Sequence, residues 1–190
     1  MNKSLLIIIS CLFMFYSELV AARYCTTKNW ETSTEYYKKQ EKRYNGNVSL
    51  VNEAVVIYND YEFLQDHYDS DTLLKVWVGK NENAKKALIA QKELFMNEVL
   101  TLNKLRSKIL ATMKKLKTAK ELWEKLADYC YDEDHYDDYK AGRDNMRKVI
   151  KTQKKADELL AKVERMKLRY LKEVGLINGS KEKAEELTSR

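Results

Sequence analysis

Residues 84–130, AKKALIAQKELFMNEVLTLNKLRSKILATMKKLKTAKELWEKLADYC, contain neither glycine nor proline and repeat an apolar residue every seven positions. The repeated positions are Leu88, Phe95, Leu102, Ile109, Leu116 and Trp123. A seven-residue repeat keeps these side chains on one slowly drifting stripe of an α-helix. Such a stripe is useful only when another helix covers it, so we expect the rest of the chain to supply helices.

The composition of the whole chain also predicts an all-α fold. Proline is absent and glycine occurs only five times, whereas Lys, Glu, Leu and Ala are abundant. We therefore predict an antiparallel helical bundle of about five helices, pinned by one disulfide. The expected helices cover residues 27–44, 47–66, 73–78, 83–130 with a break, and 136–174.

Local stop and start signals set these boundaries. Asn45–Gly46 is a good end for the first helix, and Gly79 ends the short third one. The sequence Thr118-Ala119-Lys120-Glu121 matches a capping box, so we expect a new helix to start after Lys117. The last helix should end between Gly175 and Gly179, which leaves residues 23–177 as the bundle and 178–190 as a polar C-terminal tail.

The N-terminal residues 1–22 have the pattern of a cleaved secretory signal peptide. Lys3 precedes an apolar run, and the small residues Ala21 and Ala22 follow it. The run is short for a membrane span, and no later segment is apolar enough to supply one. We therefore expect a secreted, extracellular protein with no membrane span, and an uncleaved anchor is the alternative.

Two cysteines, Cys25 and Cys130, follow the predicted cleavage site, because Cys11 leaves with the signal peptide. In an oxidising compartment they most simply pair with each other. This disulfide would close a loop of about 105 residues, for which the chain-entropy estimate is roughly 4–5 kcal/mol. A redox pair or a metal site is the alternative, but the chain has no Cys-x-x-Cys spacing.

An acidic four-residue motif, Asp-His-Tyr-Asp, occurs twice, as Asp66-His67-Tyr68-Asp69 and as Asp134-His135-Tyr136-Asp137, at an offset of 68. The repetition favours two related helical hairpins, although a coincidence in a chain rich in Asp and Tyr explains it too. His67 and His135 are weak metal candidates, because zinc accepts His and carboxylate ligands. Exposed helix caps are the simpler interpretation, so we predict no metal and no cofactor.

No catalytic signature is present. The chain lacks a glycine-rich phosphate loop, a Gly-x-Ser-x-Gly elbow and a His-Glu-x-x-His helix, and it has only two histidines for acid–base work near neutral pH. The acidic motif also lacks the glycine and distal glutamate of an EF-hand. We therefore predict that the protein is not an enzyme.

The formal net charge is +6, which favours association with polyanions such as heparan sulfate, anionic phospholipid or nucleic acid. Tyr36 is a further candidate, because Tyr36 and Tyr37 cannot both face one seam. A solvated helical face is the alternative for the lysines. Asn47-Val48-Ser49 fits the N-glycosylation pattern, so we predict a glycan on Asn47. The basic binding candidates are Lys114, Lys115, Lys117, Lys148, Lys151, Lys154 and Lys155.

The signal peptide at residues 1–22, the helical body rich in Lys, Asn and Tyr, and the single Cys25 and Cys130 pair resemble secreted salivary effector proteins of blood-feeding or sap-feeding insects. This resemblance implies a host-directed protein that binds a component of haemostasis, complement or inflammation. We expect a monomer that binds a host protein or a polyanion. Alternatives are a carrier that encloses a small hydrophobic ligand and a self-associating protein joined through the seven-residue stripe.

Overall fold

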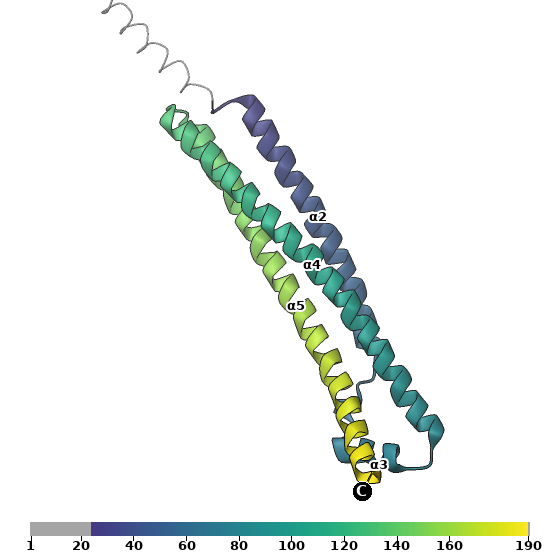
Figure 1. Cartoon of the computed structure of the whole chain (residues 1–190). Coiled ribbons are helices and arrows are strands. Elements are labelled where there is room, and N and C mark those ends of the chain that lie inside the picture. The colour runs from purple at the N-terminus through teal and green to yellow at the C-terminus, as the bar shows by residue number, and fades with distance from the viewer. Residues whose placement is uncertain (1–23, 190) are drawn as a thin grey trace, which may run out of the picture. The chain divides into compact units, whose positions relative to one another are not determined.

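The computed structural model describes residues 24–189, so the predicted signal peptide lies outside the described residues. The described chain is all-α, with four α-helices and one short 3₁₀ helix (Figure 1). It divides into two compact units, and α2, α4 and α5 each contribute a segment to both. Unit 1 holds residues 24–42 and 113–154, and unit 2 holds residues 43–112 and 155–189. The elements are α2 (Thr27–Asp60), η1 (Leu64–Asp66), α3 (Ser70–Val78), α4 (Glu82–Asp132) and α5 (Tyr136–Thr188).

In unit 1, the α4 segment runs antiparallel to the segments of α2 and α5. The predicted disulfide between Cys25 and Cys130 is present, with 4.9 Å between the two Cα atoms. Trp30 follows Cys25 by five residues and lies in α2, and its ring packs on that of Trp123 of α4, with 5.2 Å between centroids. Gly142 of α5 allows a close approach to α4, because a Cβ atom there would lie 2.9 Å from the Cβ atom of Ala127.

The turn between α4 and α5 is a Schellman motif. Asp134 takes the left-handed conformation that ends many helices, with φ of 60°. The backbone N–H of His135 donates to the carbonyl of Cys130 at 2.8 Å, and that of Asp134 donates to the carbonyl of Tyr131 at 3.1 Å. The turn thereby satisfies the last carbonyls of α4 and reverses the chain within three residues.

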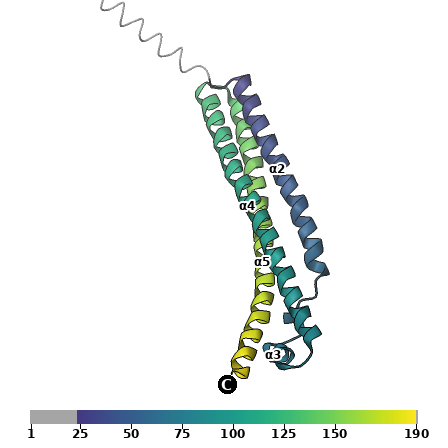
Figure 2. The same cartoon turned by 45° about the vertical axis from the view of Figure 1, so that its right-hand side comes forward.

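In unit 2, the short helix α3 packs beside the last turns of α5 (Figures 1 and 2). Asp69 caps α3 by accepting from the N–H of Thr72 at 2.7 Å, and Gly79 follows its last residue, as predicted. Trp77 is buried and donates its indole N–H to the hydroxyl of Ser180 at 3.1 Å. No helix within residues 24–189 combines the length and the apolar character that crossing a bilayer requires.

All six residues of the seven-residue stripe are buried, as predicted. Two expected breaks, however, do not occur, because α2 and α4 are continuous. Gly46 lies inside α2, and Thr118 donates its hydroxyl back to the carbonyl of Lys114 at 3.5 Å and does not cap a new helix. Buried side chains on both sides of each site outweigh the roughly 1 kcal/mol that glycine costs within a helix. The six side chains of the stripe are thus buried within the chain itself.

The expected C-terminal end was also wrong. Helix α5 continues through Gly175 and Gly179 to Thr188. Ala184 and Ser180 of the predicted polar tail are buried, and Ala184 belongs to the core cluster that contains Leu73 and Trp77 of α3. The two copies of the acidic motif occupy different local structures. The first leads into α3, and the second begins in the α4–α5 turn and continues into α5.

Candidate functional site

The non-helical junction at residues 61–69 lies between α2 and α3, and its centre is the buried ring of Phe63. This ring lies 5.4 Å from that of Phe95 on α4 and 5.6 Å from that of Tyr170 on α5, measured between centroids. Tyr58 and Tyr61 pack on the same cluster. Burial raises the pKa of the Tyr170 hydroxyl, so this tyrosine stays neutral. The aromatic cluster therefore fixes η1 on the surface of unit 2.

Two charged residues of α5 also hold η1. The carboxylate of Glu173 is fully buried and accepts the backbone N–H groups of Leu64 and Gln65. Burial raises the pKa of Glu173, and the two N–H groups partly oppose this shift. Arg169 forms an ion pair with Asp66, and its guanidinium lies 4.3 Å from the centroid of the Phe63 ring. The junction is thus a rigid platform and not a loose loop.

An open pocket of about 420 Å³, called here the basic pocket, lies against this platform. Three cationic side chains and one carboxylate contribute to its lining, and the carboxylate is already paired with Arg169. Two buried donors at the pocket, Gln65 Nε2 and Arg169 Nε, have no hydrogen-bond partner within residues 24–189. An anionic group suits this arrangement electrostatically. The lining residues are Gln65, Asp66, Arg165, Leu168, Arg169 and Lys172.

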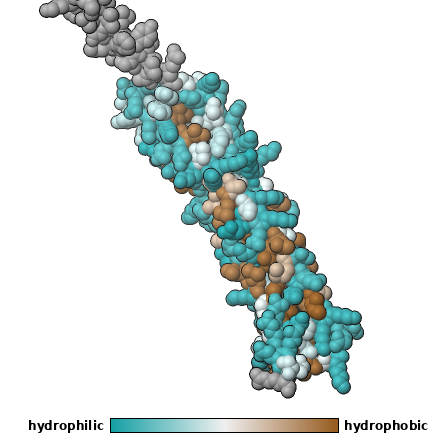
Figure 3. Space-filling view, in the orientation of Figure 1, coloured by the Kyte–Doolittle hydropathy of each residue, from teal (hydrophilic) through white to brown (hydrophobic). Residues whose placement is uncertain are grey.

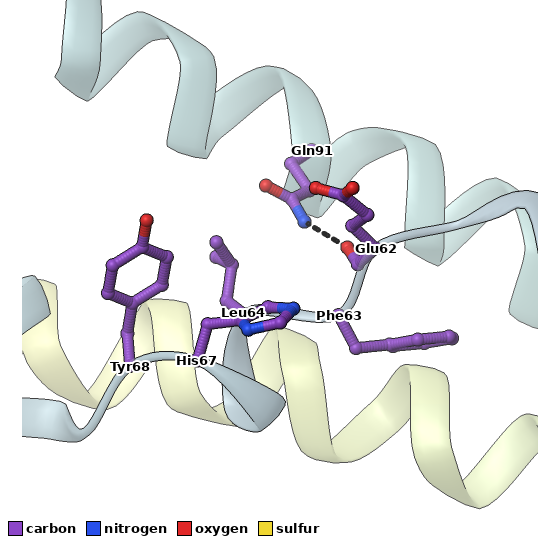
Figure 4. Close-up of a pocket in the computed structure, with 6 residues that line it drawn as sticks. All are labelled: Glu62, Phe63, Leu64, His67, Tyr68 and Gln91. Carbon is purple, nitrogen blue, oxygen red and sulfur yellow. Dashed lines mark hydrogen bonds between the residues drawn. The ribbon is translucent and has the colours of Figure 1, made fainter.

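A second pocket, of about 540 Å³, lies beside the same junction, and Figure 4 shows its lining. Gln91 of α4 donates its side-chain N–H to the backbone carbonyl of Glu62 at 3.4 Å. His67 and Tyr68 are both exposed. The pocket therefore offers polar atoms around one histidine, and Glu62 brings the only carboxylate in its lining.

The two metal candidates belong to different units, His67 to unit 2 and His135 to unit 1. His135 lies in the α4–α5 turn, with Nδ1 4.0 Å from a carboxylate oxygen of Asp138. Across residues 24–189, no group of three or more His, Cys, Asp or Glu side chains is placed to hold a metal ion. Both copies of the acidic motif lie at helix ends. Asp69 caps the N-terminus of α3, and Asp134 lies in the turn that ends α4.

An apolar groove of about 230 Å³ lies between α2 and α4 in unit 2. Leu50, Ala54, Ile57 and Leu105 form its apolar surface, and Lys104 is among the charged residues that border it. Figure 3 shows apolar side chains emerging among hydrophilic ones on the face in view. Leu50 and Ile57 keep 37% and 42% of their surface exposed, so the groove is open to solvent.

The predicted lysines do not form one surface. On α4, Lys114 and Lys117 are three residues apart and share a face, whereas Lys115 points about 100° away from Lys114. On α5, Lys148 and Lys155 are seven residues apart and share a face. Within residues 24–189, none of the seven predicted lysines has a carboxylate within 4 Å. Tyr36 is half-buried.

Sequence reasoning missed the basic residues that continue the Lys148 and Lys155 face, namely Lys162 and Arg169, with Arg165 and Lys172 beside them. The signal was available, because Lys148, Lys155, Lys162 and Arg169 follow one another at intervals of seven. The apolar stripe at 84–130 repeats with the same interval of seven residues.

The predicted glycan on Asn47 conflicts with the structure. Asn47 is 6% exposed, and its side-chain amide donates to the hydroxyl of Thr112 at 3.0 Å. A sugar on this nitrogen would break the contact between α2 and α4, so the glycosylation pattern at this position is a chance match.

The fold and these sites define a class of protein, an all-α helical bundle with one disulfide and open surface pockets. Comparison of the chain with models of protein families, with curated proteins and with solved structures found no match.

Proposed function

We propose that the chain is a secreted, non-enzymatic binding protein, a salivary effector that binds and modulates a host macromolecule of haemostasis, complement or inflammation. The observation that carries this proposal is the basic pocket, in which Arg165 and Lys172 have no carboxylate within 4 Å among residues 24–189. Cations left without a partner on a rigid platform suit recognition of an anionic group.

The same pocket favours binding over catalysis. The carboxylate of Asp66 is held by Arg169, and Glu173 is buried beneath η1, where two backbone N–H groups engage it. Neither carboxylate is therefore placed to exchange a proton with a ligand in the pocket. The cationic side chains of Arg165 and Lys172 supply positive charge and hydrogen-bond donors. General acid–base catalysis would also need a group that takes up a proton from the ligand.

The proposal is tested by producing the full chain in insect cells and examining the culture medium. We expect a secreted protein that starts at Arg23 and binds at least one purified protein in a panel of plasma and cell-surface proteins by biolayer interferometry. The double variant Arg165→Glu with Lys172→Glu should weaken that binding at least tenfold. The control Lys75→Glu with Lys86→Glu makes the same charge change elsewhere in unit 2 and should leave it unchanged. Retention of the chain in the cells, or equal binding by both variants, would overturn the proposal.

A carrier of a small hydrophobic ligand is the second candidate function, and the apolar groove between α2 and α4 favours it. Its volume of about 230 Å³ lies below the range of roughly 300–1,000 Å³ that is usual for small-molecule sites. Native mass spectrometry of the purified protein decides between the two functions. A retained apolar adduct that is lost in Ile57→Asp would place the carrier first.

A further inference from the structure

Helix α5 carries a stripe of basic side chains at alternating intervals of three and four residues. At about 100° per residue these positions fall within an arc of about 120°. Glu158 is the one position of this series that is not basic. The basic stripe consists of Lys148, Lys151, Lys155, Lys162, Arg165, Arg169 and Lys172. Its part in unit 2, from Lys155 to Lys172, follows the helix axis for about 25 Å at 1.5 Å per residue.

The basic stripe is a series of like charges along one face of α5. Opposite charges at intervals of three form ion pairs elsewhere on the helices, as between Glu82 and Lys85 or between Glu164 and Lys167. On the stripe the neighbours have the same sign, and each such pair costs a helix roughly 0.2–0.5 kcal/mol. The helix therefore carries an unfavourable charge pattern that a bound anion would relieve.

The stripe is also accessible. Lys155, Arg165 and Lys172 are exposed, and Lys162 is half-buried. Among the residues of the stripe that lie in unit 2, Arg169 has an ion-pair partner, Asp66, whereas the other four have no carboxylate within 4 Å in the part of the chain that the structure describes. The basic pocket lies at the C-terminal end of the stripe, since Arg165, Arg169 and Lys172 line it.

We propose that the part of the basic stripe in unit 2, from Lys155 to Lys172, binds a sulfated polysaccharide chain that lies along α5 and places one sulfate group in the basic pocket. A linear polyanion matches charges repeated along one axis, and guanidinium groups bind the oxygen atoms of sulfate and phosphate groups well. The inference rests on the proposed function, because such polysaccharides are extracellular.

Two other polyanions fit the stripe less well. Single-stranded nucleic acids need aromatic rings on which bases stack. Here the ring of Phe63 is buried in the aromatic cluster and covered by Arg169. A helix that lies on a membrane needs a free apolar face. On α5, Val163 and Tyr170 are buried in the core of unit 2, and the exposed Leu168 and Leu171 are too few to form an apolar face.

The inference is tested by the binding of the full secreted chain to immobilised heparin across a range of sodium chloride concentrations. The stripe variant is Lys162→Gln with Arg165→Gln and Lys172→Gln. The matched control is Lys75→Gln with Lys80→Gln and Lys86→Gln, which removes the same charge from exposed positions in unit 2. We expect the stripe variant to bind at least tenfold more weakly. Its plot of log affinity against log salt should be less steep by about two, as for the loss of three contacts to a flexible polyanion.

Three outcomes would overturn the inference. Equal loss in both variants would show that net charge alone attracts heparin. Undiminished binding to heparin from which the sulfate groups have been removed would exclude sulfate recognition. Loss of binding by the stripe variant to phosphatidylserine vesicles, with heparin binding unchanged, would assign the stripe to membranes. Loss of host-protein binding by the stripe variant, with heparin binding unchanged, would leave the proposed function standing while the inference fails. Absence of the chain from the medium would contradict the proposed function, whatever the purified chain binds.

Discussion

Units 1 and 2 are both built from segments of α2, α4 and α5, but they are held together differently. Unit 1 contains the disulfide between Cys25 and Cys130 and a tight turn at Asp134. Unit 2 contains a non-helical junction fixed by an aromatic cluster and by the buried carboxylate of Glu173. The basic pocket and the second pocket, which is lined by Glu62, His67 and Gln91 among others, both lie against this junction.

The difference shows how a helical bundle gains concave sites. Side chains of continuous helices fill the space between them in unit 1, as Trp30 and Trp123 do, and the groove between α2 and α4 in unit 2 is smaller than the two pockets at the junction. A segment that leaves the helical path, such as η1, breaks this regular packing and leaves space on both of its sides. It then needs interactions of its own to stay ordered, which Phe63 and Glu173 provide.

The largest effect should follow from removing the covalent link in unit 1. We expect Cys25→Ala with Cys130→Ala to lower the free energy of unfolding by about 4–5 kcal/mol, because the disulfide closes a loop of more than 100 residues. Urea unfolding measures this loss. Hydrogen exchange should show faster exchange in unit 1 and unchanged protection at Leu64 and Gln65 of unit 2. Equal acceleration in both units would mean that the link stabilises the whole chain and not unit 1.

The next largest effect should come from the aromatic cluster of unit 2. Phe63→Ala removes a ring that is 3% exposed and should cost about 3–5 kcal/mol. Because this ring holds η1, the backbone N–H groups of Leu64 and Gln65 should also exchange faster. Tyr68→Ala is the control on the same junction, and since Tyr68 is 49% exposed it should cost less than about 1 kcal/mol. A cost below about 1 kcal/mol for Phe63→Ala would show that η1 does not depend on the cluster.

The buried carboxylate predicts an unusual pH dependence. Burial raises the pKa of Glu173 above its ordinary value of 4.5, so the folded protein holds this proton more tightly than the unfolded chain does. The stability that Glu173 contributes is therefore complete below pH 4.5 and falls as the pH rises through the raised pKa. Glu173→Gln should cost about 1–3 kcal/mol at pH 7, because one buried N–H loses its acceptor. That cost should grow as the pH falls.

Glu164 is the matched control of opposite sign. The hydrogen bond from Lys167, with help from Arg106, lowers the pKa of Glu164 below 4.5. The contribution of Glu164 is present above pH 4.5 and is lost as the pH falls through the lowered pKa. Urea unfolding between pH 3 and pH 8 should therefore show the cost of Glu164→Gln shrinking in acid. Parallel curves for the two variants would contradict the assigned burial of Glu173.

The smallest effects should separate the glycines. Gly46 and Gly175 lie inside helices of unit 2 with no atom within 4 Å of an added Cβ, so alanine at either position should stabilise the protein by about 0.5–1 kcal/mol. In unit 1, Gly142→Ala should cost about 1–3 kcal/mol, because its Cβ would lie 2.9 Å from that of Ala127. Thermal unfolding measures all three changes. Destabilisation by Gly46→Ala would contradict the position of Gly46 inside a continuous α2 and would favour the predicted helix end at that residue.

The fold was predictable wherever one periodic pattern acted alone. The stripe from Leu88 to Trp123, the disulfide and the caps of α3 were all predicted, because each depends on spacing or on one local contact. The helix ends at Gly46 and Gly175 were not, because burial on both sides of these residues overrides their low helix propensity.

The candidate site was less predictable than the fold. Lys155 was a predicted binding residue, but it does not line the basic pocket. The pocket joins Arg165 and Lys172 to Gln65 and Asp66, which lie about 100 residues away in sequence. Phe63 joins these segments by packing on the aromatic cluster, and no local pattern announces that contact. The spacing of the basic residues on α5 was the one visible signal.

The distribution of the non-helical segments also determines where a protease can cut. Within residues 24–189, Lys80 is the one lysine or arginine that lies outside a helix, and it is exposed between α3 and α4. Trypsin needs an extended stretch of chain, so its first cut should follow Lys80. Trp77 and Leu73 would still hold α3 against α5 after that cut. A nicked protein of two fragments would therefore stay folded.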